Sequence, residues 1–325
     1  MEDIRGASLT GRGLVACAIL LVLVACSLRD DCGTEGPSPL ADLLADLNSE
    51  VVRSSCDGQV IGIACSDLAI PAFGVHMNQV VHAASTMKLP VMIEFFRRVD
   101  ASDFTLATEV VLENRFASIV DGSMYALSPK DDSDAELYER VGHKVALGEL
   151  CRRMIERSSN LATNVLIERL GAERIQATIE ALGTKRTKVL RGVEDQLAYD
   201  RGLSNTTCAR DLATLLMSLV RNQAASPDSC SAMIAILEGQ RHRSMLPQGL
   251  PVGARIAHKT GQITAIHHDA AIIWRTDGQP FVLVVLTKGF ADEDASAAVG
   301  ARIARSVWSA LTSPIWAIGD SGMRR

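Results

Sequence analysis

The chain has 325 residues, of which 47% are hydrophobic and 22% are charged. This composition is typical of a globular protein with enough apolar side chains for a sizeable core. The net charge of -5 and an aromatic content of only 4% argue against a nucleic-acid partner, which needs basic surface and stacking side chains. Composition does not distinguish among the other classes of function, so we turn to local sequence patterns.

The N-terminal segment has the features of an export signal. Arg5 and Arg12 precede an uncharged apolar stretch of 13 residues, 13–25, which is too short to cross a bilayer comfortably. It ends in "LVAC" and is similar to the signal of bacterial lipoproteins, which implies cleavage before Cys26 and lipid attachment there. We expect a signal peptide over residues 1–25, a polar tether over 26–38, and an extracytoplasmic (periplasmic) protein that contacts a membrane only through this lipid. An unlipidated secretory signal is the alternative.

The eight cysteines show no C-x-x-C pair, so neither a zinc knuckle nor a redox motif is predicted. Cys17 belongs to the signal and Cys26 would carry lipid, which leaves six in the exported part. In an oxidising compartment some of them could pair, for example Cys56 with Cys65, but the sequence leaves the connectivity open.

The first part of the chain predicts a helix, two strands and a second helix. Apolar residues recur at helical spacing in "PLADLLADLNSEVVRSS", and two strand-like runs separated by Pro71 follow. The next apolar helix begins after Ser85. Residues 113–138 contain many turn-forming residues and predict a surface excursion.

The second part is mainly helical and then changes period. Helical spacing extends over 144–219, with breaks near Gly171 and Gly183 and within 190–205, and another helix is expected from 227. Three strands are expected at 254–263, 267–276 and 280–289, with turns at 261–264 and 277–278, and a final helix at 291–312.

This order predicts an α+β protein of the three-layer sandwich type. Segments from both ends of the chain share an antiparallel sheet flanked by helices, and the middle forms an all-helical subdomain. The expected boundaries are a domain over 39–313, with 39–85 and 251–313 as its α/β part and 86–250 as its mainly helical part, and a tail over 314–325.

Three short motifs carry candidate chemistry. In "STMK" an amine lies one helical turn from a hydroxyl, so that Lys88 could activate Ser85; the alternative is a helix cap beside a solvated lysine. In "SSN", Ser158 and Asn160 could equally be capping residues. In "HKTG", Lys259 lies inside an apolar strand, where an unpaired ammonium would be costly to bury.

Together these motifs resemble the class A serine β-lactamases and their penicillin-binding relatives, whose signature is S-x-x-K, S-D-N and K-T-G. The resemblance extends from about residue 40 to 312. It implies that Ser85 is the acylated nucleophile, that Lys88 takes or relays its proton, and that Ser158 passes a proton to the lactam nitrogen. Asn160 would bind the substrate's side-chain amide.

The same resemblance assigns the strand residues. Lys259 and Thr260 would bind the substrate carboxylate, and Gly261 would leave room for the ligand. The backbone N–H groups of Ser85 and Gln262 would form the oxyanion hole, because developing charge requires fixed donors.

Glu194 follows Ser158 by 36 positions, where the family has the glutamate that activates water for hydrolysis of the acyl-enzyme. Chemically the step needs a carboxylate near the ester that accepts a proton from water. The alternative for Glu194 is a solvated loop residue.

Several positions depart from the family pattern. Ser159 replaces the aspartate of the second motif, Ala198 stands where an asparagine helps to hold the water, and the loop is about two residues short. Some members of the family have a disulfide between the positions of residues 92 and 151. Cys151 stands at one end, but Met92 stands at the other, so we expect no such disulfide.

The family's strand arginine is also missing, and His267 and His268 stand near its place. Adjacent strand residues point to opposite faces, so these histidines do not readily share a metal ion. We expect no metal or cofactor, and we expect His268 beside the substrate carboxylate.

The leading interpretation is a monomeric class A β-lactamase that acts on small β-lactams. The alternatives are a D-alanyl-D-alanine peptidase or penicillin-binding hydrolase, and a covalent β-lactam sensor that is acylated but hardly turns over.

Overall fold

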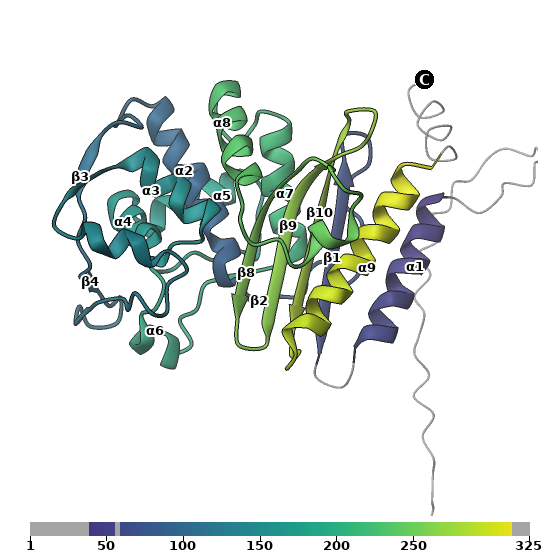
Figure 1. The fold of residues 1–325 in the computed structure, drawn as a ribbon, viewed down its shortest axis with the longest axis horizontal. Helices are drawn as coiled ribbons and strands as arrows, with labels where there is room; N and C mark the ends of the chain where they lie inside the picture. The colour runs from purple at the N-terminus through teal and green to yellow at the C-terminus, as the bar shows by residue number, and fades with distance from the viewer. Residues whose placement is uncertain (1–38, 56–58, 314–325) are drawn as a thin grey trace, which may run out of the picture. The chain divides into compact units, whose positions relative to one another are not determined.

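The computed structural model describes residues 39–55 and 59–313. Its centre is a four-stranded antiparallel sheet in the order β1-β10-β9-β8, in which the N-terminal strand pairs with the last one (Figure 1). The strands are β1 (Val60–Asp67), β8 (Ile256–Ile263), β9 (Ile266–Trp274) and β10 (Pro280–Lys288). The backbone of residues 73–75 also bonds to β1, so that β8 is the edge left open toward the helical part.

Helices cover both faces of this sheet, which explains why its strands are apolar on both sides. One face packs against α1 (Pro39–Ser54) and α9 (Glu293–Leu311), and the other against α7 (Ala209–Val220) (Figure 1). Along β10 the side chains alternate, because successive strand residues point to opposite faces. Phe281, Leu283 and Val285 enter the core under α1 and α9, whereas Val282, Val284 and Leu286 enter the core on the other side.

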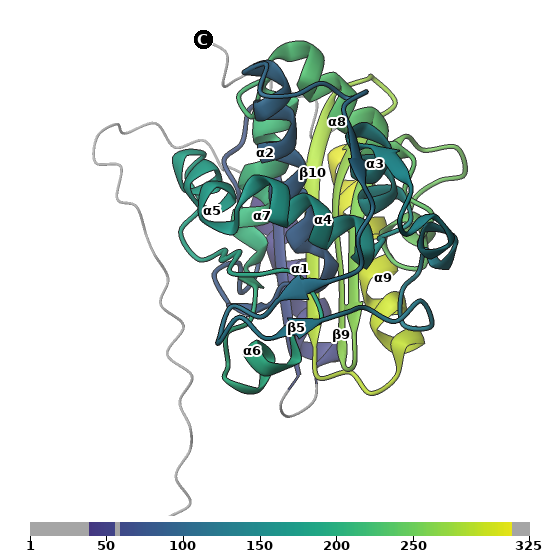
Figure 2. The same ribbon diagram turned by 90° about the vertical axis from the view of Figure 1, so that its left-hand side faces the viewer.

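The helical part lies beyond the open edge of β8 (Figure 1) and faces the viewer in Figure 2. Its helices are η1 (Ala84–Met87), α2 (Lys88–Asp100), η2 (Ala135–Arg140), α3 (Leu147–Glu156), α4 (Asn160–Leu170), α5 (Ala172–Ala181), α6 (Gln196–Asp200) and α8 (Pro227–Glu238). The short helix η3 (Leu246–Gly249) instead packs against α9. Three small antiparallel pairs join its loops: β2 (Val81–His82) with β7 (Thr206–Thr207), β3 (Glu109–Val111) with β6 (Lys144–Ala146), and β4 (Phe116–Ala117) with β5 (Met124–Tyr125). Helix α2 packs against α3, α4, α5 and α8, so the helix that follows Ser85 is the centre of this part.

The predicted α+β fold is confirmed, including the sheet shared by the two ends of the chain. Three local expectations need correction. The strand expected over 71–82 is limited to β2 and an isolated bridge at Phe73, and the turn expected at 261–264 lies at 264–265. The excursion over 113–138 is not purely superficial, because Phe116 and Leu127 are buried in the main core.

Cys65, Cys151, Cys208 and Cys230 are buried free thiols. The suggested partner of Cys65, Cys56, lies outside the described residues, as do the signal peptide, the tether with Cys26 and the tail. Within residues 39–55 and 59–313, no helix combines the length and apolar character needed to cross a membrane.

Candidate active site

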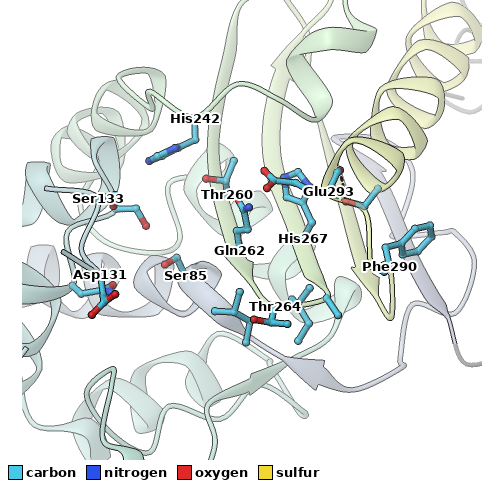
Figure 3. Close-up of a pocket in the computed structure, with 17 residues that line it drawn as sticks. Ser85, Asp131, Ser133, His242, Thr260, Gln262, Thr264, His267, Phe290 and Glu293 are labelled. Carbon is cyan, nitrogen blue, oxygen red and sulfur yellow. Dashed lines mark hydrogen bonds between the residues drawn. The ribbon is translucent and has the colours of Figure 1, made fainter. Parts of the chain in front are cut away.

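A cavity of about 500 Å³ lies between the open edge of β8 and the loops of the helical part. Ser85 lies between Asp131 and Ser133 on one side and Thr260 and Gln262 on the other (Figure 3). Ser158 and Asn160 also line it. The cavity therefore brings together residues from all three sequence motifs, which are up to 177 positions apart in the chain (85 to 262).

Three backbone positions in this region lie in the left-handed region that favours glycine. Ala84, which precedes Ser85, has a φ of 45°, Ser158 has 60° and Glu194 has 61°. Such conformations cost free energy in residues with a side chain and persist only where the surroundings impose them, often at functional sites. The two expected catalytic residues that lie outside helices, Ser158 and Glu194, are thus both held in unusual backbone conformations.

The Lys88 amine is fully buried and points toward the start of α4. Its Nζ donates to the Ser158 carbonyl oxygen at 2.6 Å, to Ser158 Oγ at 3.2 Å and to Asn160 Oδ1 at 2.8 Å. Burial lowers the pKa of Lys88 to about 7, although the carboxylates of Asp132 and Glu194 oppose this shift. Among the described residues, Ser85 Oγ has no hydrogen-bond partner, so the Lys88–Ser85 contact expected from the motif is not formed in this state.

Ser158 Oγ lies between two amines. Lys259 Nζ, which is also fully buried, donates to Ser158 Oγ at 3.0 Å and to the Thr260 carbonyl at 2.7 Å. Burial, reinforced by the Lys88 amine, lowers the pKa of Lys259 well below its usual value. A hydroxyl has two acceptor positions and one proton. Because both acceptor positions of Ser158 Oγ face amines, its proton is available to a third group.

The edge strand presents backbone groups to Ser85. Trp274 N donates to the Arg255 carbonyl at 3.1 Å, which makes these two residues a hydrogen-bonded pair of the β8–β9 ladder. Pairs alternate along an antiparallel ladder, so Gln262, seven positions later, belongs to a non-bonded pair and its N–H points away from β9. A Cβ on Gly261 would lie 3.0 Å from both Ser85 N and Thr86 N. Gly261 therefore makes room for the backbone of the Ser85 segment, and not only for a ligand.

Glu194 reaches the site through Asn160, whose Nδ2 donates to Glu194 Oε1 at 2.7 Å. Burial of the carboxylate raises its pKa, the Asn160 bond opposes this, and the nearby carboxylates of Asp132 and Asp131 raise it further. The neighbouring Asp195 anchors the loop. It accepts hydrogen bonds from Ser118 Oγ, Ile119 N and Ala198 N.

The two strand histidines have separate environments. His268 is fully buried on the helical side of the sheet, where its Nε2 lies 2.9 Å from the His82 carbonyl, and burial lowers its pKa to about 4. It does not line the cavity. His267 does, with Nδ1 3.0 Å from Ser296 Oγ. The histidine at the cavity wall is thus His267, because β9 turns its odd-numbered side chains toward α9. In the described ranges, no group of three or more His, Cys, Asp or Glu side chains is arranged to hold a metal ion.

Some site residues were missed from the sequence. Asp131, Ser133 and His242 line the cavity, and Asp132 bonds to the start of α4. The run "DDSD" over 131–134 is the available signal, since it places three carboxylates within four residues. Its turn-forming residues predict only a surface excursion.

The comparisons with known proteins agree with this geometry. Residues 43–311 match the model of the "Beta-lactamase2: Beta-lactamase enzyme family". A β-lactamase of Bacillus amyloliquefaciens is 27% identical over 150 residues, which cover 45% of this chain and 49% of that protein. The chain thus spans about half the length of the curated relatives it matches first.

Two solved structures resemble most of the fold. The β-lactamase of Sphaerobacter thermophilus is 25% identical with a TM-score of 0.71, and the match covers 83% of this chain and 99% of that one. A mutant of PBP-A, solved as an acyl-enzyme complex with penicillin G, is 28% identical with a TM-score of 0.70, covering 84% and 97% of the two chains.

Proposed function

The chain belongs to the beta-lactamase enzyme family, and we propose that it is a class A serine β-lactamase that opens β-lactam rings through an acyl-enzyme on Ser85. The observation that carries this proposal is the arrangement of two buried amines around Ser158 Oγ, beside a cavity lined by Ser85. Such an arrangement supplies a base for the nucleophile and an acid for the leaving nitrogen.

Formation of the acyl-enzyme begins with Lys88. As an ammonium, Lys88 can satisfy Ser158 O, Ser158 Oγ and Asn160 Oδ1 with its three protons. Loss of one proton leaves a lone pair that can accept the proton of Ser85 Oγ as this oxygen attacks the lactam carbonyl. Because burial holds the Lys88 pKa at about 7, we expect the acylation rate to rise with pH through about pH 7.

The leaving nitrogen and the carbonyl oxygen need partners of their own. Ser158, with both acceptor positions facing amines, delivers its proton to the lactam nitrogen when the C–N bond breaks and takes one back from Lys88 Nζ, 3.2 Å from its Oγ. The proton removed from Ser85 is thereby passed on to the leaving nitrogen. The N–H groups of Ser85 and Gln262 stabilise the developing oxyanion, because they are fixed donors on η1 and at the edge of β8. Lys259 and Thr260 bind the substrate carboxylate, with His267 on the same wall.

Hydrolysis of the ester completes the cycle. Glu194 accepts a proton from the attacking water, and the proton returns to Ser85 Oγ as the ester bond breaks; the bond to Asn160 holds the carboxylate toward the site. Glu194 must be ionised to accept this proton. Because its pKa is raised, hydrolysis should be lost on acidification at a higher pH than the usual pKa of a glutamate would give.

A second candidate function is a hydrolase or sensor that keeps its acyl group. The observation in its favour is Ala198, a fully buried residue at the position where the family's asparagine helps to hold water. Time-resolved mass spectrometry of the intact protein with benzylpenicillin separates the candidates. Turnover with a transient adduct supports the β-lactamase, a persistent adduct supports the second candidate, and an unmodified protein with intact antibiotic contradicts both.

Export and lipid attachment form a separate proposal, and a monomeric state stays a prediction. Cys26→Ala should move the protein from the membrane fraction to the soluble fraction of expressing cells. Unchanged partitioning would exclude Cys26 as the lipid site, whereas retention of the signal peptide in both forms would exclude its cleavage.

A further inference from the structure

Residues 131–134 form a cavity wall whose side chains alternate between two environments. Asp131 and Ser133 line the cavity, whereas Asp132 and Asp134 are turned into the protein, with only 8% and 2% of their surface exposed. A buried carboxylate is costly unless it is hydrogen-bonded or paired, so the partners of these two residues show what holds the wall.

Asp134 anchors the wall to α3. Both of its oxygens accept from Arg153 Nη1, at 2.9 and 3.0 Å, and Oδ1 also accepts from Arg157 Nη1 at 2.9 Å. Asp134 contacts neither α4 nor the reacting groups through any of these bonds. Its role is confined to fastening the loop.

Asp132 instead binds the first turn of α4. Its Oδ2 accepts from Asn160 N, Leu161 N and Tyr138 Oη, each at 2.9 Å, and its Oδ1 accepts from Asp134 N at 3.0 Å. The first N–H groups of a helix have no partner within the helix and favour a negative charge. The side chain of Ser159, which stands where the motif usually has an acid, accepts from Ala162 N at 3.3 Å and not from the first N–H groups of α4. The carboxylate therefore comes from a loop 28 positions away from Asn160.

The residue held by Asp132 joins the two proposed proton acceptors. Asn160 accepts from Lys88 Nζ through Oδ1 and donates to Glu194 through Nδ2. A displacement of the α4 start would move both contacts together. We propose that Asp132 is a positioning residue for the proposed reaction: it fixes Asn160, and thereby Lys88 and Glu194, and supplies a negative charge that both of these groups experience.

The electrostatic consequence has a definite sign. Asp132 raises the pKa of Lys88 against the effect of burial, and it adds to the raised pKa of Glu194. Removal of its charge should lower both values. The titratable and charged groups that face Lys88 and Glu194 come from several elements: Asp131 and Asp132 on the loop before η2, Tyr138 on η2, Lys259 on β8 and His242 on the loop before η3.

The test compares Asp132→Asn with Asp134→Asn, a matched loss of a buried carboxylate from the same loop. Because the inference rests on the proposed function, single-turnover acylation by benzylpenicillin is measured from pH 5 to 10. We expect Asp132→Asn to lower the plateau of the acylation rate at high pH about tenfold, because Asn160 is misplaced. The acid limb of the profile, where the rate rises with pH, should move to lower pH. Asp134→Asn should leave the position of the limb unchanged, whatever its plateau.

Tyr138→Phe separates charge from hydrogen bonding, because it removes one donor to Asp132 and keeps the carboxylate. Its acid limb should not move to lower pH. If the limb of Asp132→Asn coincides with that of the unmodified protein, or if Asp134→Asn shifts as far, Asp132 has only a structural role and the proposal is wrong.

A readout without substrate keeps the two proposals apart. The ¹³Cε resonance of Lys88, assigned with a Lys88→Met variant, reports the titration of the amine directly. A lower midpoint in Asp132→Asn supports the inference even if no penicillin acylates the protein, a result that would contradict the proposed function alone. An unchanged midpoint overturns the inference even in an active enzyme.

Discussion

Two parts of the candidate site differ in how firmly they are built. Lys88 and Lys259, to which the proposed mechanism assigns formation of the acyl-enzyme, extend from α2 and β8 and are fully buried and hydrogen-bonded. Glu194, to which it assigns hydrolysis, lies on the irregular segment between α5 and α6, is exposed, and reaches the site through a single side-chain bond from Asn160.

The difference teaches that, in the proposed mechanism, acylation and hydrolysis would depend on separable parts of the fold. Regular elements impose the positions of the amines, because moving either one would break the packing of α2 or the ladder of β8. The position of Glu194 instead depends on its neighbour Asp195, whose bonds to Ser118, Ile119 and Ala198 fasten the loop. Variants of the two amines and variants of Glu194 should therefore have different kinetic effects on acylation and on hydrolysis.

Lys88→Met should have the largest effect, because it removes the base while keeping most of the buried volume. We expect acylation by benzylpenicillin to fall about 10³-fold or more. Stopped-flow single-turnover measurement gives the rate, and circular dichroism checks that the fold is intact. A folded variant that is acylated at a near-normal rate would remove Lys88 from the mechanism.

Glu194→Gln should uncouple the two steps. We expect steady-state hydrolysis to fall about 10²- to 10³-fold while acylation stays within severalfold, so that an adduct accumulates on the intact protein. Glu168→Gln is the matched control, since Glu168 also has a pKa raised by burial, but its charged neighbour is Glu113, whereas Glu194 is bonded to Asn160. Equal turnover in the Glu194 variant and the unmodified protein would show that another group activates water.

Gly261→Ala tests the contact between β8 and the nucleophile. Its Cβ would lie 3.0 Å from Ser85 N and Thr86 N, which forces the strand and the Ser85 segment apart. We expect acylation to slow by about 10- to 100-fold because the oxyanion donors separate. Hydrolysis of a preformed acyl-enzyme should slow as well, and an unaffected acylation rate would place the oxyanion hole elsewhere.

Ala198→Asn should have the smallest effect on turnover and acts mainly on stability. Ala198 is fully buried next to the Asp195 cap, so a larger polar side chain overfills the site. We expect a loss of about 1–3 kcal/mol in the free energy of unfolding, measured by urea denaturation, and no gain in hydrolysis. Faster hydrolysis with unchanged stability would mean that the asparagine side chain reaches the cavity after all.

Much of the fold could be predicted because its elements are long and strongly patterned. The run of apolar residues in β10 and the helical spacing in α1 and α9 identify both the type of element and its approximate ends. The weakly patterned segments were less predictable. The 71–82 strand is short because its pairing with β1 ends at an isolated bridge, which propensity alone does not indicate.

At the candidate site, the sequence predicted Ser85, Lys88, Ser158, Asn160, Thr260 and Gln262, because their motifs are short and ordered, and the structure places these residues close together. It did not identify Asp132, because a loop carboxylate acquires a role only when the chain folds it against the start of α4. It also predicted His268 at the site, whereas His267 lines the cavity, because the face of a strand residue depends on the register with its neighbours.

The sequence by itself determined the order and type of the main elements and the chemical groups available for nucleophilic attack, because periodicity and short motifs are local properties. Only the tertiary structure decided which carboxylates face the Lys88 amine, which backbone N–H groups point to Ser85 and which amines surround Ser158. These relations join residues that are distant in the chain, and they are set by side-chain packing and strand register rather than by any local pattern.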